Sequence, residues 1–142
     1  MLTDTKPDVC MMGLGYIGLP TAAVIARSGC RVLGVDVQQH VVDTINRGDI
    51  HIEEVDLEGL VRGVVDRGLL RAATMAEPSD VYLIAVPTPF DAEFRPDISY
   101  VLEAATSIAA VLRPGNILIL ESTSPVGTTE QMRDLIADLR PD

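Results

Sequence analysis

Short apolar runs alternate along this chain with stretches in which apolar and polar residues are mixed at helical spacing. The apolar runs lie at 9–12, 31–35, 81–86 and 116–120, with a shorter one at 69–72. Continuous apolar runs of this length, bounded by turn-forming residues, are typical of strands that are buried on both faces of a parallel sheet. The pattern therefore predicts five strands, and those at 31–35, 81–86 and 116–120 are expected to be buried.

The stretches between these runs predict helices at 17–26, 38–47, 57–65, 97–112 and 130–139. Each connection is long enough to bring the following strand back parallel to the one before it. The predicted fold class is therefore α/β, with a Rossmann-like doubly wound parallel sheet, strand order 3-2-1-4-5, and helices on both faces in three αβα layers. A chain of 142 residues is expected to form one domain, residues 1–142.

A glycine-rich motif, Gly13-Leu14-Gly15-Tyr16-Ile17-Gly18, stands between the first predicted strand and the first predicted helix. Strand, tight turn and helix is the context in which such a motif binds the pyrophosphate of a dinucleotide. Gly13 would permit the turn, Gly15 would let the pyrophosphate approach the backbone, and Gly18 would let the helix pack on the sheet. The anion would then lie against free N–H groups of the helix.

An acidic residue follows the second predicted strand at the spacing that this motif requires. Asp36 lies eighteen positions after Gly18, where a carboxylate can accept hydrogen bonds from the adenosine ribose. The same carboxylate would repel a 2′-phosphate, and residues 37–40 supply no arginine, so NAD is favoured over NADP. The alternative interpretation is that Asp36 is an ordinary turn or helix-capping residue.

Two hydroxyl-bearing loops follow the fourth and fifth predicted strands. Thr88 lies between two prolines that stiffen the first loop, and Thr123 lies early in the second. The carboxyl ends of parallel strands form the edge where ligands bind in open α/β sheets. The sequence therefore predicts one site at this edge. The alternative interpretation is that the prolines around Thr88 only end the strand. Thr128 or Thr129, near a helix start, is interpreted first as a capping residue.

The charge of the chain narrows its possible partners. A net charge of -10 without clusters of Lys or Arg disfavours nucleic acids and anionic membranes as partners. The uncharged segment 9–26 could be taken for a membrane span. Three glycines and Pro20 inside it, with no basic flank, disfavour that alternative.

Neither cysteine is predicted to act chemically. Cys10 and Cys30 fall in the first strand and at the start of the second, where thiols usually pack in a core, and they lack the spacing of metal ligands. His51 is interpreted as a loop residue, so no metal site is predicted. The polar start, residues 1–8, indicates no signal peptide, and we therefore expect a cytoplasmic protein.

The ordered set of motifs resembles the NAD-binding amino-terminal domain of the UDP-glucose/GDP-mannose dehydrogenase family. The matching stretches are residues 13–22, 34–36, 45–48, 83–90 and 119–127. This resemblance implies that NAD is contacted by the side chains or backbone of Tyr16, Ile17, Asp36, Thr88 and Thr129. It also implies that Thr123 lies beside the reacting centre and helps to position the catalytic water.

The resemblance further implies a reaction, and it implies that some of the catalytic residues lie outside this chain. Members of the family oxidise the C6 alcohol of a UDP-sugar or related nucleotide sugar to a carboxylate, in two steps that consume two NAD. The chemistry passes through a cysteine nucleophile, aided by a lysine. Both residues belong to the family's central and carboxyl-terminal domains, whereas this chain stops at Asp142, so we expect a domain that is inactive alone. Dimers form through the central region, so the full-length protein is expected to be a homodimer.

The sequence departs from the family pattern at one loop position, and two alternative functions are open. Relatives commonly carry proline where this chain has Val55, which affects only the expected shape of that loop. The two alternative functions are another Rossmann dehydrogenase acting on a hydroxy acid and a stand-alone NAD-binding or regulatory module. The sequence of the gene beyond Asp142 distinguishes these alternatives.

Overall fold

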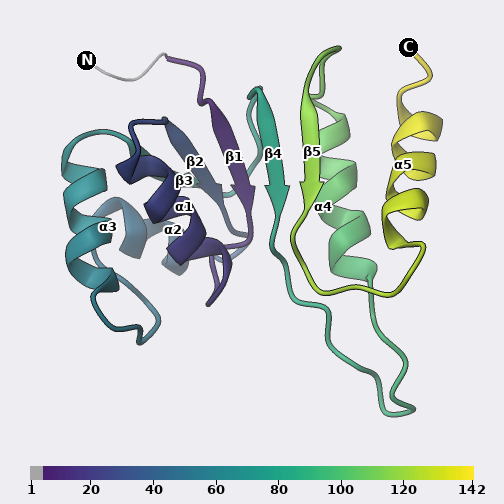
Figure 1. Cartoon of the computed structure of the whole chain (residues 1–142), viewed down its shortest axis with the longest axis horizontal. Helices are drawn as coiled ribbons and strands as arrows, with labels where there is room; N and C mark the ends of the chain where they lie inside the picture. Colours follow the sequence, from purple (N-terminus) through teal and green to yellow (C-terminus); the bar gives the residue numbers. More distant parts are fainter. Residues whose placement is uncertain (1–4) are drawn as a thin grey trace.

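The computed structural model describes residues 5–142 as one five-stranded sheet with helices on both sides (Figure 1). The strands are β1 (Val9–Met12), β2 (Val32–Val35), β3 (Leu70–Ala73), β4 (Val81–Ile84) and β5 (Ile117–Leu120). They lie in the order β3-β2-β1-β4-β5, and every neighbouring pair is parallel. The predicted doubly wound fold and its strand order are confirmed.

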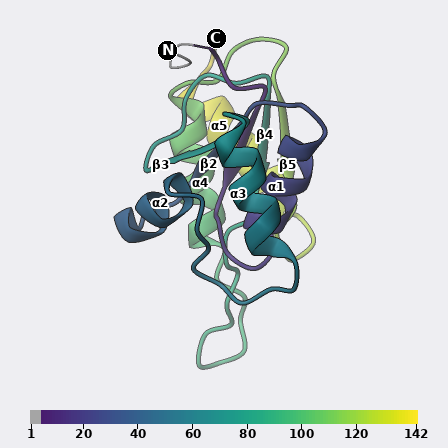
Figure 2. The same ribbon diagram turned by 90° about the vertical axis from the view of Figure 1, so that its left-hand side faces the viewer.

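Five helices connect or follow these strands within the described residues. They are α1 (Gly18–Arg27), α2 (Gln39–Asn46), α3 (Leu57–Asp66), α4 (Ser99–Ala109) and α5 (Thr128–Leu139). Residues of α1, α2 and α3 pack in one apolar cluster on one face of the sheet, and residues of α4 and α5 pack in a second cluster on the other face. Figure 2 views the molecule from the side of α3, with α5 behind the sheet. The predicted helices are confirmed, although α4 is shorter than 97–112 and α5 begins two residues before Glu130.

The central strands are buried on both faces because successive side chains point to opposite helix layers. In β1, Val9 and Met11 join the cluster of α1–α3, whereas Cys10 and Met12 join the cluster of α4 and α5. All four residues of β1 and all four of β2 are buried. The prediction of a buried strand at 31–35 is confirmed.

The corresponding prediction for β5 is wrong. The side chains of Ile117 and Ile119 are 56% and 42% exposed, and only Leu118 and Leu120 pack against the cluster of α4 and α5. β5 is partly exposed because of its place in the sheet. Helices α1–α3 belong to the connections that run from β1 to β3, and they therefore cover that half of the sheet. The opposite face of β5, at the other end of the sheet, has no helix over it among the described residues (Figure 1).

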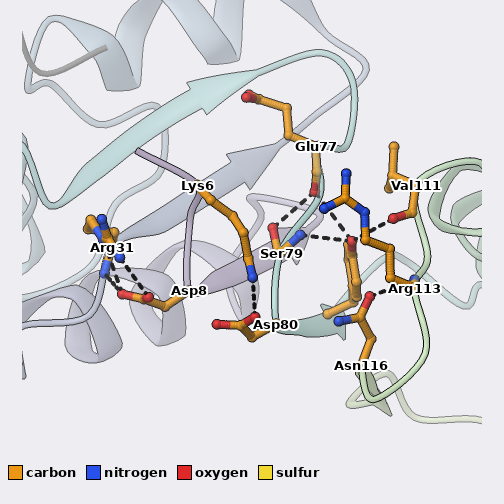
Figure 3. A network of polar contacts seen from close by, with 10 residues as sticks. Lys6, Asp8, Arg31, Glu77, Ser79, Asp80, Val111, Arg113 and Asn116 are labelled. Carbon is orange, nitrogen blue, oxygen red and sulfur yellow. Dashed lines mark hydrogen bonds and ion pairs between the residues drawn. The ribbon is translucent and has the colours of Figure 1, made fainter. Parts of the chain in front are cut away.

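Polar contacts tie the strands together at the amino-terminal edge of the sheet (Figure 3). Asp8 accepts a hydrogen bond from the backbone N–H of Arg31 at 2.8 Å and pairs with its guanidinium at 3.1 Å. These bonds hold the pKa of Asp8 below its usual value. The buried hydroxyl of Tyr82 accepts a hydrogen bond from the backbone N–H of Ser79 at 2.9 Å. This network lies before the strands, at the edge opposite the glycine turn.

The two cysteines carry no disulfide. Cys10 is fully buried, and burial raises the pKa of its thiol to about 12. Across residues 5–142 no helix has the length and apolar character needed to cross a membrane. In that same part of the chain no group of three or more His, Cys, Asp or Glu side chains is gathered as a metal site would require. Of the polar start at 1–8, residues 1–4 lie outside the described residues.

Candidate functional site

Three loops meet at the carboxyl edge of the sheet. The glycine turn follows β1, and the loops that carry Thr88 and Thr123 follow β4 and β5, which are the next two strands across the sheet. The edge lies at the lower end of the strands in Figure 1. Backbone hydrogen bonds extend the sheet into the loops: Ala85 N–H donates to Met12 at 2.8 Å, and Glu121 N–H donates to Ile84 at 2.9 Å. The predicted convergence of the three loops is confirmed.

Different physical constraints act at the three glycine positions of the motif. Gly13 has φ of +98°, and a Cβ there would come within 2.6 Å of the Ala85 carbonyl oxygen. A Cβ on Gly18 would come within 1.8 Å of the Gly13 carbonyl oxygen. Both residues are therefore required by the packing of the chain itself.

Gly15 differs from its two neighbours. It has no positive φ, and apart from Gly15 itself and its two chain neighbours no protein atom lies within 4 Å of the position that a Cβ would take. Nothing in the protein therefore demands glycine at this position. The open space beside the Gly15 backbone fits the close approach of a pyrophosphate, which is the role that the motif predicts.

The amino terminus of α1 presents its N–H groups to this open space. Its first turn has no acidic residue and no side-chain cap, so the partial positive charge of the helix end is available to an anion. Tyr16 and Ile17 lie just before the helix with 64% and 60% of their surface exposed. One carboxylate does approach from β5, because Glu121 accepts a hydrogen bond from the Thr21 hydroxyl at 3.3 Å.

Asp36 is held in place by the backbone on both sides of the turn. Its Oδ2 accepts a hydrogen bond from Leu14 N–H at 3.2 Å, and its Oδ1 accepts one from Gln38 N–H at 3.0 Å. The bond to Gln38 is the ordinary turn contact considered as an alternative. The bond to Leu14 adds a link between the end of β2 and the glycine motif. The carboxylate is therefore oriented before any ligand arrives.

Thr88 and Thr123 are in direct contact. The Thr88 hydroxyl donates a hydrogen bond to the Thr123 carbonyl oxygen at 2.6 Å, and the Thr123 side chain stays exposed. Sequence analysis missed the neighbouring Ser122, whose hydroxyl donates to the Val86 carbonyl oxygen at 2.8 Å. A hydroxyl directly after the end of a parallel strand is the signal that would have identified it.

The interpretation of Thr128 or Thr129 as a helix cap is wrong. The residue before α5 is Gly127, with φ of +92°, and no side-chain hydrogen bond caps the helix. The Thr128 hydroxyl instead donates to the Pro125 carbonyl oxygen at 2.8 Å and is buried. Gly127 turns the chain sharply, so Thr128 already lies inside the helix. Thr129 is exposed in the first turn of α5.

A separate open hollow of about 1070 Å³ lies along the loop between α2 and α3. Its lining includes the acidic residues Asp49, Glu53, Glu54, Asp56 and Glu58. It contains no residue of the glycine turn or of the β4 and β5 loops. Carboxylates repel phosphate groups, so this hollow is a poor site for a dinucleotide in spite of its size.

Comparisons with known proteins agree with this geometry. Residues 7–141 match the sequence profile of the UDP-glucose/GDP-mannose dehydrogenase family, NAD binding domain. The chain is 56% identical, over 134 residues, to UDP-N-acetyl-D-mannosamine dehydrogenase of Escherichia coli (strain K12) and 57% identical to NDP-N-acetyl-D-galactosaminuronic acid dehydrogenase of Ralstonia nicotianae. Each match covers 94% of this chain but 32% of the relative. The chain thus spans about a third of the length of these relatives.

Solved structures give the same result. A UDP-N-acetyl-mannosamine dehydrogenase from Staphylococcus aureus superimposes with a TM-score of 0.89 at 39% identity, over 94% of this chain and 32% of that one. A GDP-mannose dehydrogenase from Pseudomonas aeruginosa, solved as a ternary complex, superimposes with a TM-score of 0.90 at 29% identity. That match covers 95% of this chain and 33% of the other.

Proposed function

This chain belongs to the UDP-glucose/GDP-mannose dehydrogenase family as its NAD-binding domain, and from that premise we propose that it is the cofactor-binding part of a UDP-sugar 6-dehydrogenase. The proposed substrate is UDP-N-acetyl-D-mannosamine, which the whole protein would oxidise to UDP-N-acetyl-D-mannosaminuronate with two NAD. The substrate is taken from the name of the relative that is 56% identical. A relative named for a different amino sugar is 57% identical, so the sugar is the least supported part of the proposal.

The observation that carries the proposal is the open space beside Gly15 at the free end of α1. The diphosphate of NAD would lie there, against the backbone N–H groups of the helix. The carboxylate of Asp36 would accept hydrogen bonds from the adenosine ribose. Gly13 and Gly18 shape the turn, and the exposed Tyr16 and Ile17 flank it.

The nicotinamide end of the cofactor would reach the loops of β4 and β5. Bound NAD supplies the hydride acceptor of the oxidation. In the proposed arrangement Thr88 and Thr129 contact the cofactor, and the exposed hydroxyl of Thr123 helps to position the water that hydrolyses the oxidised sugar. Support comes from the direct contact between Thr88 and Thr123 at the same edge as the glycine turn.

We propose that the oxidation also needs residues beyond this chain. A nucleophilic cysteine must form a thiolate near neutral pH. Cys10 is a poor candidate, because it is buried and its thiol has a pKa raised to about 12. The cysteine and lysine would come from the remaining two thirds of the family's length, so the 142-residue chain alone would bind cofactor without turning over sugar.

The setting of the reaction is also part of the proposal. The whole protein would act as a homodimer in the cytoplasm, and its product would be a precursor of cell-surface polysaccharide. Family membership sets aside the alternative of a hydroxy-acid dehydrogenase. The alternative of a stand-alone NAD-binding module predicts a stop codon directly after Asp142, whereas the dehydrogenase predicts a downstream domain that contains the cysteine and the lysine.

Calorimetric titration of the 142-residue chain with NAD and with NADP tests the cofactor assignment. We expect NAD to bind and NADP to bind at least about tenfold more weakly, a difference of about 1.4 kcal/mol, because Asp36 repels the 2′-phosphate. Asp36→Asn serves as the matched variant and should narrow the difference. Equal affinity of the wild-type chain for NAD and NADP would remove the role assigned to Asp36.

A further inference from the structure

The loops that follow β4 and β5 exchange hydrogen bonds in both directions. Ser122, in the β5 loop, donates its hydroxyl to the carbonyl oxygens of Val86 at 2.8 Å and Ile84 at 3.3 Å. Thr88, in the β4 loop, donates its hydroxyl to the Thr123 carbonyl oxygen at 2.6 Å. Each loop therefore supplies a hydroxyl donor to the backbone of the other.

These bonds continue the sheet where the backbone cannot. The ladder between β4 and β5 reaches as far as the N–H groups of Glu121 and Ser122, which both donate to Ile84. Beyond that point the β4 loop contains Pro87 and Pro89, which have no N–H to donate. The Thr88 hydroxyl supplies a donor from the β4 loop in place of the missing N–H groups, and the Ser122 hydroxyl adds a donor from the β5 loop.

We propose that Ser122 is a positioning residue for the nicotinamide half of NAD, a role that rests on the function proposed above. Together with Thr88 it locks the β4 and β5 loops into one surface, and that surface holds the nicotinamide end. The adenosine and diphosphate groups lie on the β1 and β2 side of the site, at Gly15 and Asp36. Ser122 therefore acts on one half of the cofactor and leaves the other half unaffected.

The hydrogen bonds between the two loops also determine which atoms of Thr88 and Thr123 are available to a ligand. The Thr88 hydroxyl hydrogen is committed to the Thr123 carbonyl, so its oxygen offers lone pairs to a ligand donor. The Thr123 side chain is exposed while its carbonyl is held. Loss of the Ser122 hydroxyl would free the β5 loop and let both groups move away from the cofactor.

The test compares the affinities of the 142-residue chain for NAD and for ADP, measured by calorimetry in wild type and Ser122→Ala. One lost hydrogen bond predicts an NAD affinity that is lower by about two- to tenfold. The affinity for ADP, which lacks the nicotinamide half, should be unchanged. Ser122→Thr keeps the hydroxyl and should restore the affinity for NAD.

Thr128→Val is the matched control. Its hydroxyl also donates to a carbonyl oxygen in the β5 loop, that of Pro125, but the bond does not cross to the β4 loop, so affinity for NAD should be unchanged. If Ser122→Ala does not fold, Ser122→Cys, which keeps a weak donor of similar size, should show a smaller loss for NAD alone.

The outcomes separate this inference from the proposed function. A wild-type chain that binds no NAD would overturn both. A wild-type chain that binds NAD, with Ser122→Ala binding it equally well, would overturn the inference alone. Equal losses for NAD and ADP in the variant would show that Ser122 supports the fold in general, and this would also overturn the inference.

Discussion

The central strands β1 and β2 and the edge strand β5 are built from similar apolar sequences and have very different surroundings. In β1 and β2 every residue is buried, whereas in β5 no residue is fully buried. The first half of the chain places α1–α3 on one face of its strands, and α4 and α5 cover the other face. β5 has only the second of these layers (Figure 1).

This difference indicates that most of the stability of the domain comes from the core around β1 and β2, whereas part of the candidate site lies in loops outside that core. The interior of β1 and β2 supplies the doubly covered core. The loops after β4 and β5 depend on a sheet edge with one bare face, and they are held by hydroxyl contacts across the two loops. We therefore expect substitutions inside β1 and β2 to affect folding, and substitutions in the loops after β4 and β5 to affect ligand binding more than folding.

The largest expected effect comes from truncating one apolar side chain in the interior strand β2 and one in the edge strand β5. Leu33, in β2, is fully buried, so Leu33→Ala should lower the free energy of unfolding by about 2–5 kcal/mol. Ile119, in β5, is 42% exposed, so Ile119→Ala should cost about 1 kcal/mol or less. Urea denaturation followed by circular dichroism measures both. Equal losses of unfolding free energy would contradict the contrast between β2 and β5.

Two glycines of one turn test whether folding and binding can be separated within the first half. Gly18→Ala places a Cβ against the Gly13 carbonyl and should destabilise the domain by about 1–3 kcal/mol. Gly15→Ala meets no protein atom, so its unfolding free energy should match wild type, while affinity for NAD should fall at least about tenfold. Unfolding curves and calorimetry measure the two properties. Normal NAD binding by Gly15→Ala would contradict the placement of the diphosphate.

The smallest effect concerns acid stability. Glu77 accepts two hydrogen bonds from Arg71, at 2.6 and 2.9 Å, and these lower the pKa of Glu77. Because the folded pKa lies below the unfolded value, the pair stabilises the fold above the unfolded pKa. This contribution is lost as the pH falls through the folded value. Both side chains are partly exposed, so solvent screening limits the contribution to a few tenths of a kcal/mol, about the typical size for surface pairs.

The matched variants for this effect are Arg71→Gln and Arg95→Gln. Arg71 lies in β3, whereas Arg95 pairs with Asp91 in a loop that projects beyond the sheet at the bottom of Figure 1. Arg71→Gln should reduce the loss of unfolding free energy between neutral and acidic pH, because it removes the stabilisation that acid would otherwise remove. Arg95→Gln should change that pH dependence less, because the pKa of Asp91 is lowered chiefly by a backbone hydrogen bond from Arg95 that the substitution keeps. The reverse order would show that the projecting loop contributes more to global stability than the sheet edge does.

Much of the candidate site could be predicted from sequence because its signals are local. The glycine motif, the acidic residue after the second strand and the hydroxyls after later strands each depend on a few neighbouring residues. Ser122 was missed because its importance comes from two carbonyl oxygens that are distant in the chain, those of Ile84 at the end of β4 and Val86 in the loop that follows. The helix start at Thr128 was also misjudged, because the left-handed turn at Gly127 carries the chain into the helix without a side-chain cap.

By itself the sequence determined the order and type of the elements, because apolar periodicity and turn residues act over a few positions and connection lengths restrict how parallel strands can be joined. Tertiary structure alone decided how deeply each strand is buried and which hydroxyls meet. An apolar run such as residues 117–120 has the same pattern at the centre of a sheet as at its edge. Burial depends on which helices lie over the strand, and that is settled only when distant parts of the chain pack together.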